Sequence, residues 1–237
     1  MADLSQRFNA PLYTVAEAAR FVGVPTSTFA TWGRGYTRDR PGGITSVGAP
    51  VVTFAPAPRG QASVPFIGLA EGLVLAAIRE AGVPLQRIRP ALALLQDELG
   101  FEHVLASKRL FTDGAEVLYD YAERTGDTPE GRSVRELVVV RHGQRVFAEV
   151  VETYLRGVEF DTKGYARLIR LPRYGTAQIV ADPDRGFGQP IFTSGGARLE
   201  DVLAMFRSGE PLRVVSEEYG VPLPELEDAV RVALRAA

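Results

Sequence analysis

The sequence predicts an α+β fold that is mostly helical, with an N-terminal winged helix-turn-helix domain and a C-terminal α+β domain. Two short amphipathic segments meet at the turn Gly23-Val24-Pro25. Three helical segments, separated by Gly and Pro breaks, close the chain. Between them, the stretch 125–132 is polar, rich in Gly and Pro, and without an apolar period. We therefore expect one domain at residues 1–124 and a second at residues 133–237.

The N-terminal domain is expected to begin with the helix-turn-helix. Thr14 should cap the first helix, because Glu17 follows it at the spacing of a capping box. Gly23 ends that helix, and Pro25 opens a second helix that runs to about Trp32. The remaining expected elements are a wing hairpin with strands at 44–47 and 51–54, helices at 66–81 and 84–99, and a hairpin whose strands, 109–112 and 115–119, flank Asp113-Gly114.

The C-terminal domain is expected to combine short strands with helices. Its apolar and alternating segments predict strands at 137–140, 158–160, 165–171 and 178–180, with a helix at 145–155. Three closing helices are predicted at 199–207, 212–219 and 224–234, and we expect them to form a homeodomain-like bundle.

The composition excludes several classes of site. The chain has no cysteine and two histidines, so neither thiolate chemistry nor a histidine-based metal site is expected, and no cofactor is predicted. No apolar run reaches the ~18–20 residues of a membrane span. The N-terminus also lacks a signal-peptide pattern, so we expect a cytoplasmic protein. The net charge is −2, but residues 1–63 hold six basic and three acidic side chains, which suits a module that meets phosphate.

The second helix of the helix-turn-helix is expected to enter DNA, although a helical hairpin that only packs is the alternative. Its N-terminal end carries short hydroxyl side chains, where a recognition helix presents hydrogen-bonding groups to bases and phosphates. A basic cluster follows directly and is expected to contact phosphates. The candidate DNA-binding residues are Thr14, Thr26, Ser27, Thr28, Thr31, Arg34, Tyr36, Arg38 and Arg40.

A second segment of the same shape lies near the C-terminus. Residues 211–229 align without gaps with the first motif, so that Gly220-Val221-Pro222 matches Gly23-Val24-Pro25. Its second helix carries Glu225, Glu227 and Asp228 where the first carries hydroxyls. Because carboxylates repel phosphate, we expect this copy to contact protein instead of DNA.

Several longer motifs resemble a known family. SVPFIGLAE at 63–71 and LAAIREAGVPLQRIRPAL at 75–92 resemble the central helices of VapB-type antitoxins with a MerR-like N-terminal domain. GQPIF at 188–192, GARL at 196–199 and DVLAMFRSGE at 201–210 are similar to a domain of unknown function in those antitoxins, commonly encoded beside a PIN-domain protein. The resemblance implies a type II, VapBC-like antitoxin that represses its own operator and neutralises a PIN-domain ribonuclease toxin by protein–protein contact.

The expected partners are therefore operator DNA, the toxin and a second copy of the chain, with no membrane. A homodimer is expected because one helix-turn-helix reads only one half-site. An arginine of the C-terminal domain would suit an acidic nuclease site. The candidate toxin-binding residues are Arg167, Arg170, Arg173, Met205 and Phe206.

Two other functions stay open at this point. One is an effector-responsive MerR-like regulator without a toxin, whose C-terminal domain holds a small ligand. The other is a hydrolase, but its only candidate groupings are Glu98 with Glu102 and His103, and Asp161 with Asp182 and Asp184. Neither grouping has ligand spacing, so we predict no catalytic residue and no metal ligand, and we expect a protein that is not an enzyme.

Overall fold

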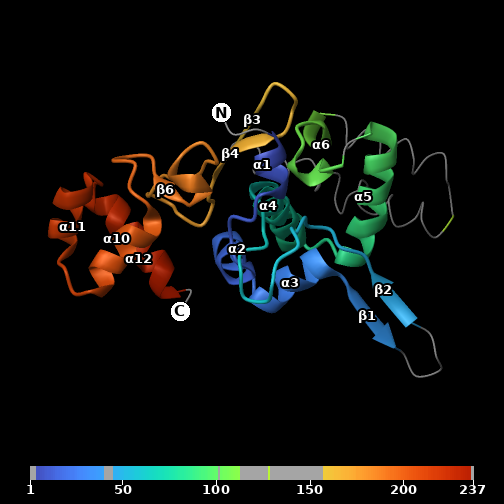
Figure 1. The fold of residues 1–237 in the computed structure, drawn as a ribbon, viewed down its shortest axis with the longest axis horizontal. Coiled ribbons are helices and arrows are strands. Elements are labelled where there is room, and N and C mark those ends of the chain that lie inside the picture. The colour runs from blue at the N-terminus through green and yellow to red at the C-terminus, as the bar shows by residue number, and fades with distance from the viewer. Residues whose placement is uncertain (1–3, 40–44, 101, 113–127, 129–156, 236–237) are drawn as a thin grey trace.

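The computed structural model describes residues 4–39, 45–100, 102–112, 128 and 157–235. Within these residues helices accompany a two-stranded hairpin and a four-stranded antiparallel sheet, which confirms the α+β class. The helices α10 (Leu199–Arg207), α11 (Leu212–Tyr219) and α12 (Leu223–Arg235) form one end of the molecule (Figure 1). The sheet lies beside them, and α4 (Phe66–Glu80) runs through the middle of the N-terminal half.

The N-terminal half is built around α4. Twelve of its fifteen residues are buried, because apolar side chains occur all round this helix. The short helices α1 (Leu4–Asn9), α2 (Val15–Val22) and α3 (Thr26–Arg34) pack near it, and α2 and α3 are the predicted helix-turn-helix. Gly72 allows Phe29 of α3 to pack closely against α4, since a Cβ at this position would collide with the Phe29 ring. The predicted helices at 66–81 and 84–99 are confirmed as α4 and α5 (Leu85–Leu99).

The wing hairpin differs from the prediction in one strand. Strand β2 (Thr45–Gly48) confirms the strand expected at 44–47, but its partner is β1 (Tyr36–Asp39) and not residues 51–54. The backbone N–H groups of Val51 and Val52 instead donate to the carbonyl of Trp32, at 2.8 and 3.2 Å. This segment therefore covers the C-terminal end of α3, and the strand beside β2 is the one that carries Tyr36 and Arg38.

The prediction of a strand at 109–112 is wrong, because these residues form α6 (Arg109–Thr112). The side chain of Ser107 accepts the N–H of Arg109 at 3.2 Å, which is the capping that favours a helical turn. The turn follows the short helix η1 (Val104–Ala106).

Several expected elements lie outside the described residues. These are Asp113-Gly114, the strand at 115–119, the strand at 137–140, the helix at 145–155 and all of the stretch 125–132 except Thr128.

The C-terminal strands form one antiparallel sheet in the order β3-β4-β5-β6. Strands β3 (Val158–Phe160), β4 (Ala166–Arg170) and β5 (Ile179–Ala181) confirm the predicted strands, whereas β6 (Ile191–Phe192) is too short to give a sequence signal. The three closing helices are confirmed within a residue at each end. These three helices pack beside the sheet, and residues 193–198 connect β6 to α10.

The two halves of the chain are in contact in the described residues. Arg7 of α1 is buried, and its guanidinium binds Asp161 at 2.6 Å and the carbonyl of Ala166 at 3.1 Å. The hydroxyl of Tyr13 donates to the carbonyl of Gly188, and burial raises the pKa of this phenol, so it stays a donor. One buried apolar cluster includes residues of both halves. In the part of the chain described here, no helix is both long and apolar enough to span a membrane.

Candidate nucleic-acid interface

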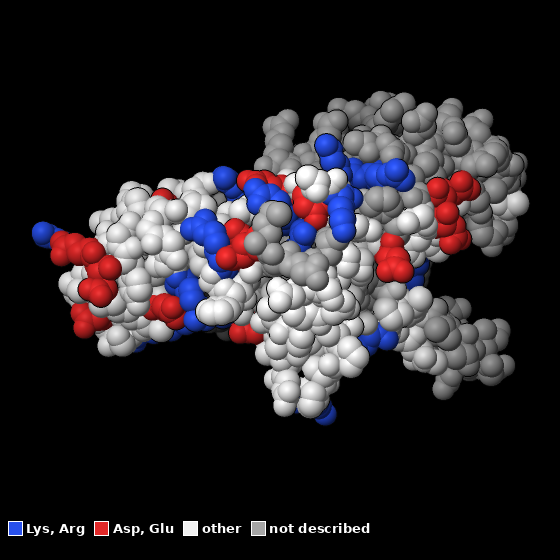
Figure 2. Space-filling view, turned by 45° about the horizontal axis from the view of Figure 1, so that its top comes forward, with Lys and Arg blue, Asp and Glu red and all other residues white. Residues whose placement is uncertain are grey.

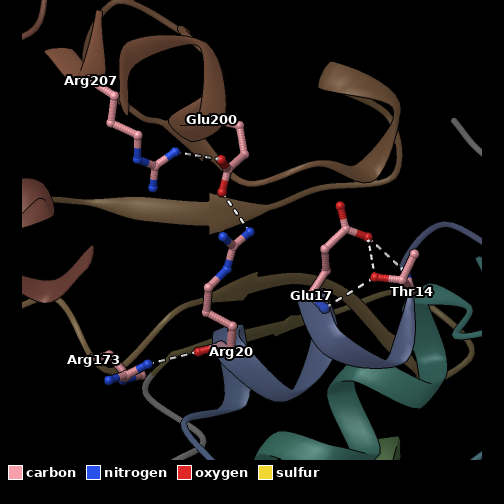
Figure 3. A network of polar contacts seen from close by, with 6 residues as sticks. All are labelled: Thr14, Glu17, Arg20, Arg173, Glu200 and Arg207. Atoms are coloured by element: carbon pink, nitrogen blue, oxygen red, sulfur yellow. Dashed lines mark hydrogen bonds and ion pairs between the residues drawn. The ribbon is translucent and has the colours of Figure 1, made fainter. Parts of the chain in front are cut away.

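Thr14 lies immediately before α2 and caps it. Its Oγ1 accepts the N–H of Glu17 at 3.2 Å, and the Glu17 carboxylate accepts the N–H of Thr14 at 2.8 Å (Figure 3). The capping box expected from the spacing is therefore confirmed. The Thr14 hydroxyl also donates to Glu17 at 2.8 Å, so the side chain of this candidate DNA-binding residue already holds the start of α2.

The turn that follows α2 sets the direction of α3. Gly23 has φ +86°, a left-handed conformation in which most other residues are strained, and its N–H donates to the carbonyl of Ala19 at 2.8 Å. After the turn, Phe29 and Trp32 are buried on one side of α3, with 0% and 3% of their surface exposed. Thr26 and Ser27 lie on the other side, exposed to solvent.

The remaining threonines of α3 are less exposed to solvent. Thr28 is half-buried, and so is Thr31, whose hydroxyl donates to the carbonyl of Ser27 at 2.9 Å. Arg34 is exposed at the C-terminal end of the helix. The structure thus leaves the two hydroxyls of the first turn, and the cation of the last, open to solvent.

The N-terminus of α3 is open as well. Pro25 is the N-cap residue and makes no side-chain hydrogen bond to the helix. The first N–H groups of α3 therefore have no cap, and the helix dipole adds partial positive charge there. Beside this end lies a groove of about 620 Å³, whose lining includes Thr26, Arg20 and Arg173.

The β1–β2 hairpin projects from the N-terminal half beyond α3 (Figure 1). Arg38 lies in β1, opposite Ser46 of β2, and Arg40 lies outside the described residues. Tyr36 is half-buried at the base of the hairpin, under the guanidinium of Arg89 at 5.1 Å from the ring centre. Arg89 of α5 also donates to the carbonyl of Ala49 at 2.8 Å. The sequence analysis missed Arg89, and no local pattern could have paired it with Tyr36 of β1, which lies 53 residues earlier in the chain.

Two arginines, Arg20 and Arg173, connect the helix-turn-helix to the C-terminal half. Arg20 of α2 binds Glu200 of α10 at 2.5 Å, and Arg207 binds the other oxygen of Glu200 at 3.4 Å. Arg173, which follows β4, donates to the backbone carbonyl of Arg20 at 2.8 Å (Figure 3). The side chain of Arg173 also lies against Gly23, close to where a Cβ of that residue would be. This candidate toxin-binding arginine therefore contacts the helix-turn-helix of its own chain.

The other candidate toxin-binding residues occupy different environments. Arg167 is exposed and binds Glu159 at 2.6 Å across the sheet edge, and Arg170 is exposed with its guanidinium on Gln178. Met205 and Phe206 of α10 are half-buried and pack against the apolar cluster. The five candidate residues therefore do not share one environment. Arg173 binds its own chain, the other two arginines are exposed, and the two apolar side chains are half-buried.

The second motif has the backbone shape of the first, but its acids point differently from our expectation. Gly220 has a positive φ of +63° at the turn, and Gly23 in the first motif also has a positive φ, of +86°. However, Asp228 is buried and accepts the N–H groups of Thr176 and Ala177 at 2.7 and 3.0 Å, and Glu225 accepts that of Gln178 at 3.1 Å. Two of the three acids thus hold the segment before β5, because they satisfy backbone donors that have no partner in the sheet.

Acidic side chains still gather at this end of the molecule (Figure 2). The exposed ones on or beside α11 and α12 are Glu210, Glu217, Glu218 and Glu227. Such a surface would repel phosphate, so the two motifs differ in charge although they share a backbone.

The carboxylate groupings considered for a hydrolase are used structurally. Asp161 binds Arg7, and Asp182 accepts the N–H of Asp184 at 2.9 Å in a turn. His103 binds the carboxylate of the buried Glu71 at 2.9 Å. Within the described ranges, no group of three His, Asp or Glu side chains is placed to hold a metal ion.

Comparison with known proteins agrees with this architecture. Residues 11–92 match a family described as "Putative DNA-binding HTH domain". The "Putative antitoxin VapB45" of Mycobacterium tuberculosis is 49% identical over 231 residues, which cover 96% of each chain. The "Uncharacterized protein Rv2308" of the same organism is 25% identical over 97% of this chain and 93% of its own length.

A solved structure extends the comparison to the fold. The crystal structure of Rv2018 from Mycobacterium tuberculosis superposes with a TM-score of 0.78 at 46% identity, covering 94% of this chain and 99% of that one. Both the sequence and the fold are therefore shared over nearly the full length. The chain belongs to the protein family that includes the mycobacterial "Putative antitoxin VapB45".

Proposed function

We propose that this protein is the antitoxin of a type II, VapBC-like toxin–antitoxin system, and that it represses its own promoter. It binds operator DNA through α3 as a homodimer and neutralises a PIN-domain ribonuclease toxin by protein–protein contact. The observation that carries the proposal is that α3 has one side buried in the core and one side exposed to solvent. Phe29 and Trp32 fix one side of the helix in the core, while Thr26 and Ser27 stand exposed at its N-terminal end.

The DNA contact follows from the chemistry of that end. Uncapped N–H groups and the helix dipole favour a phosphate oxygen there, and the hydroxyls of Thr26 and Ser27 are able to reach base edges or phosphates. Arg34 is the last residue of α3, Arg38 lies in the hairpin, and Arg40 follows in the chain. We propose that the hairpin is the wing of a MerR-like domain and that these arginines bind backbone phosphates. The absence of Asn, Gln or Arg from the first turn of α3 predicts a modest share of direct base readout.

The toxin contact is assigned to the C-terminal half, residues 133–237, because the N-terminal half supplies the DNA-binding helix. Arg167 and Arg170 face solvent on the sheet and remain candidates for it. Met205 and Phe206 also remain candidates through the part of each side chain that is exposed. The relative named as an antitoxin supports a toxin partner in general.

An effector-responsive regulator without a toxin is the second candidate. A cavity of about 420 Å³ lies between α5 and the segment that follows the hairpin, with Arg89 and the Glu71 carboxylate in its lining. Because Arg89 also holds Tyr36 and Ala49, a ligand there would act on the base of the wing. This function predicts that operator affinity of the purified protein changes with a small molecule and is indifferent to the neighbouring PIN-domain protein.

The salt dependence of operator binding tests the DNA contact. DNA fragments selected by the purified full-length protein supply the operator. The double variant Arg34→Ala, Arg38→Ala should bind it more weakly, and the slope of log affinity against log salt should fall by about 1.8, or ~0.9 for each lost phosphate contact. Arg213→Ala, which removes one exposed positive charge from α11, is the control and should leave the slope unchanged. An unchanged slope in the double variant would refute the phosphate contacts.

A further inference from the structure

The loop between β5 and β6 contains a turn that L-amino acids rarely adopt. Its three residues form the short helix η2 (Gly186–Gly188), and all three have positive φ angles of 56°, 55° and 77°. Glycine accepts this conformation freely, but the middle residue is Phe187. Phe187 is the one residue other than glycine with positive φ among those the structure describes, and a bulky side chain there is strained.

The strain brings no gain in packing. The side chain of Phe187 is 89% exposed, the largest value among the exposed large hydrophobic side chains of the described ranges. Folding therefore gains almost nothing from this ring, and a glycine would suit the backbone better. A strained, fully solvated aromatic residue points to a role outside the fold of the isolated chain.

Hydrogen bonds hold the backbone around Phe187 in place. The N–H groups of Arg185 and Gly188 donate within the loop at 3.0 Å each, to the carbonyls of Asp182 and Arg185. Tyr13 donates to the carbonyl of Gly188, and the side chain of Gln189 donates to the carbonyl of Leu12 at 3.1 Å. The loop is thus anchored on the segment that precedes α2. Because this backbone is already ordered, little backbone entropy is lost when a partner covers the ring.

We propose that Phe187 is the aromatic anchor of the toxin-binding surface, where it fills an apolar pocket of the toxin. This rests on the function proposed above. Aromatic side chains are enriched at the cores of protein–protein interfaces, where a few anchor residues carry most of the binding energy. A partner pocket that is apolar inside and acidic at its rim would also suit Arg185, the exposed cation next to the turn.

Two other occupants are disfavoured by what surrounds the loop and by the grooves of this chain. A second copy would need an apolar pocket for the ring, but both grooves described above have charged side chains in their lining. These are Arg20, Arg173 and Glu200 beside α2, and Arg89, Glu71 and Glu102 beside α5. DNA would meet the exposed side chain of Asp184 beside that of Arg185, so this turn offers phosphate no net positive charge. A protein pocket is therefore the occupant that this chemistry fits.

The test measures binding of the full-length chain to the PIN-domain protein encoded beside it. Phe187→Ala should weaken this binding at least 30-fold, or ~2 kcal/mol. Phe187→Leu should recover most of it. Leu234→Ala, which removes an exposed apolar side chain from α12, is the matched control and should bind like the wild type. The urea midpoint and the operator affinity without toxin should be unchanged in Phe187→Ala, since the ring packs against nothing.

The outcomes separate the two proposals. If the wild type does not bind the PIN-domain protein, the proposed function fails and the anchor fails with it. If the wild type binds and Phe187→Ala binds equally well, the anchor is refuted while the proposed function stands. A change of dimer mass or of operator affinity in Phe187→Ala without toxin would assign the ring to a second copy or to DNA and would also overturn the anchor.

Discussion

Arg173 allows a direct test of whether an arginine of the C-terminal half serves the fold or the partner. Its guanidinium donates to the carbonyl of Arg20 in the last turn of α2, and its side chain lies against Gly23. A hydrogen bond from a charged group contributes about 1.5–3 kcal/mol when it is buried. Because Arg173 is only half-buried, solvent screening places the loss in Arg173→Ala near the lower end, at about 1.5 kcal/mol.

Arg167→Ala is the matched control, because it removes the same charge from an exposed pair. The two side chains of that pair, Arg167 and Glu159, are 44% and 56% exposed, and such pairs contribute about 0–1 kcal/mol. With a urea m-value of about 3 kcal/mol/M, Arg173→Ala should lower the unfolding midpoint by about 0.5 M. Arg167→Ala should shift it much less.

The same two variants are then compared in toxin binding and operator binding. Arg173→Ala should leave toxin affinity close to that of the wild type and weaken operator binding, since the turn at Gly23 loses its support. An unchanged urea midpoint together with a large loss of toxin affinity would refute this reasoning. In that case Arg173 would reach the partner, as the sequence analysis expected.

Two further predictions concern the packing of α3 and of α12. Gly72→Ala should cost about 1–3 kcal/mol and weaken operator binding, because its methyl group would displace Phe29 and with it α3. Gly175→Ala, where a Cβ has open space, should leave the urea midpoint unchanged, and equal midpoints for the two variants would contradict the argument. Burial alone would raise the pKa of Asp228, but backbone N–H groups led by that of Ala177 outweigh it and lower the pKa. Asp228 therefore stabilises the fold above the ordinary aspartate pKa of 3.8, and this stability is lost as the pH falls through the lowered value. Asp228→Asn should unfold at lower urea than the wild type at neutral pH, and the difference should shrink on acidification; a difference independent of pH would contradict the assignment.

The local features of the fold could be predicted from the sequence because short-range chemistry fixes them. The capping box of Thr14 and Glu17 spans three residues, and the turn at Gly23 depends on one residue that accepts a positive φ. The three closing helices have apolar periods that end at Gly and Pro breaks. These signals depend on hydrogen bonds and side-chain spacing within one or two turns of chain.

Only the tertiary structure decided what the charged and polar side chains do. Arg173 and the carbonyl that it binds are 153 residues apart, and Asp228 meets backbone donors 51 and 52 residues away. The composition of the segment with Val51 and Val52 predicts a strand, yet the carbonyl of Trp32 near the end of α3 accepts both of their N–H groups.

The strain at Phe187 was equally invisible in the sequence, because the Gly residues on either side of it are compatible with many turns. Periodicity reports which face of an element is apolar, but not which distant donor or acceptor packing brings to it. The sequence by itself therefore determined the helix-turn-helix, the main helices and the strands β3, β4 and β5 of the C-terminal sheet. The packing of the two halves determined which arginines and carboxylates remain free to meet a partner.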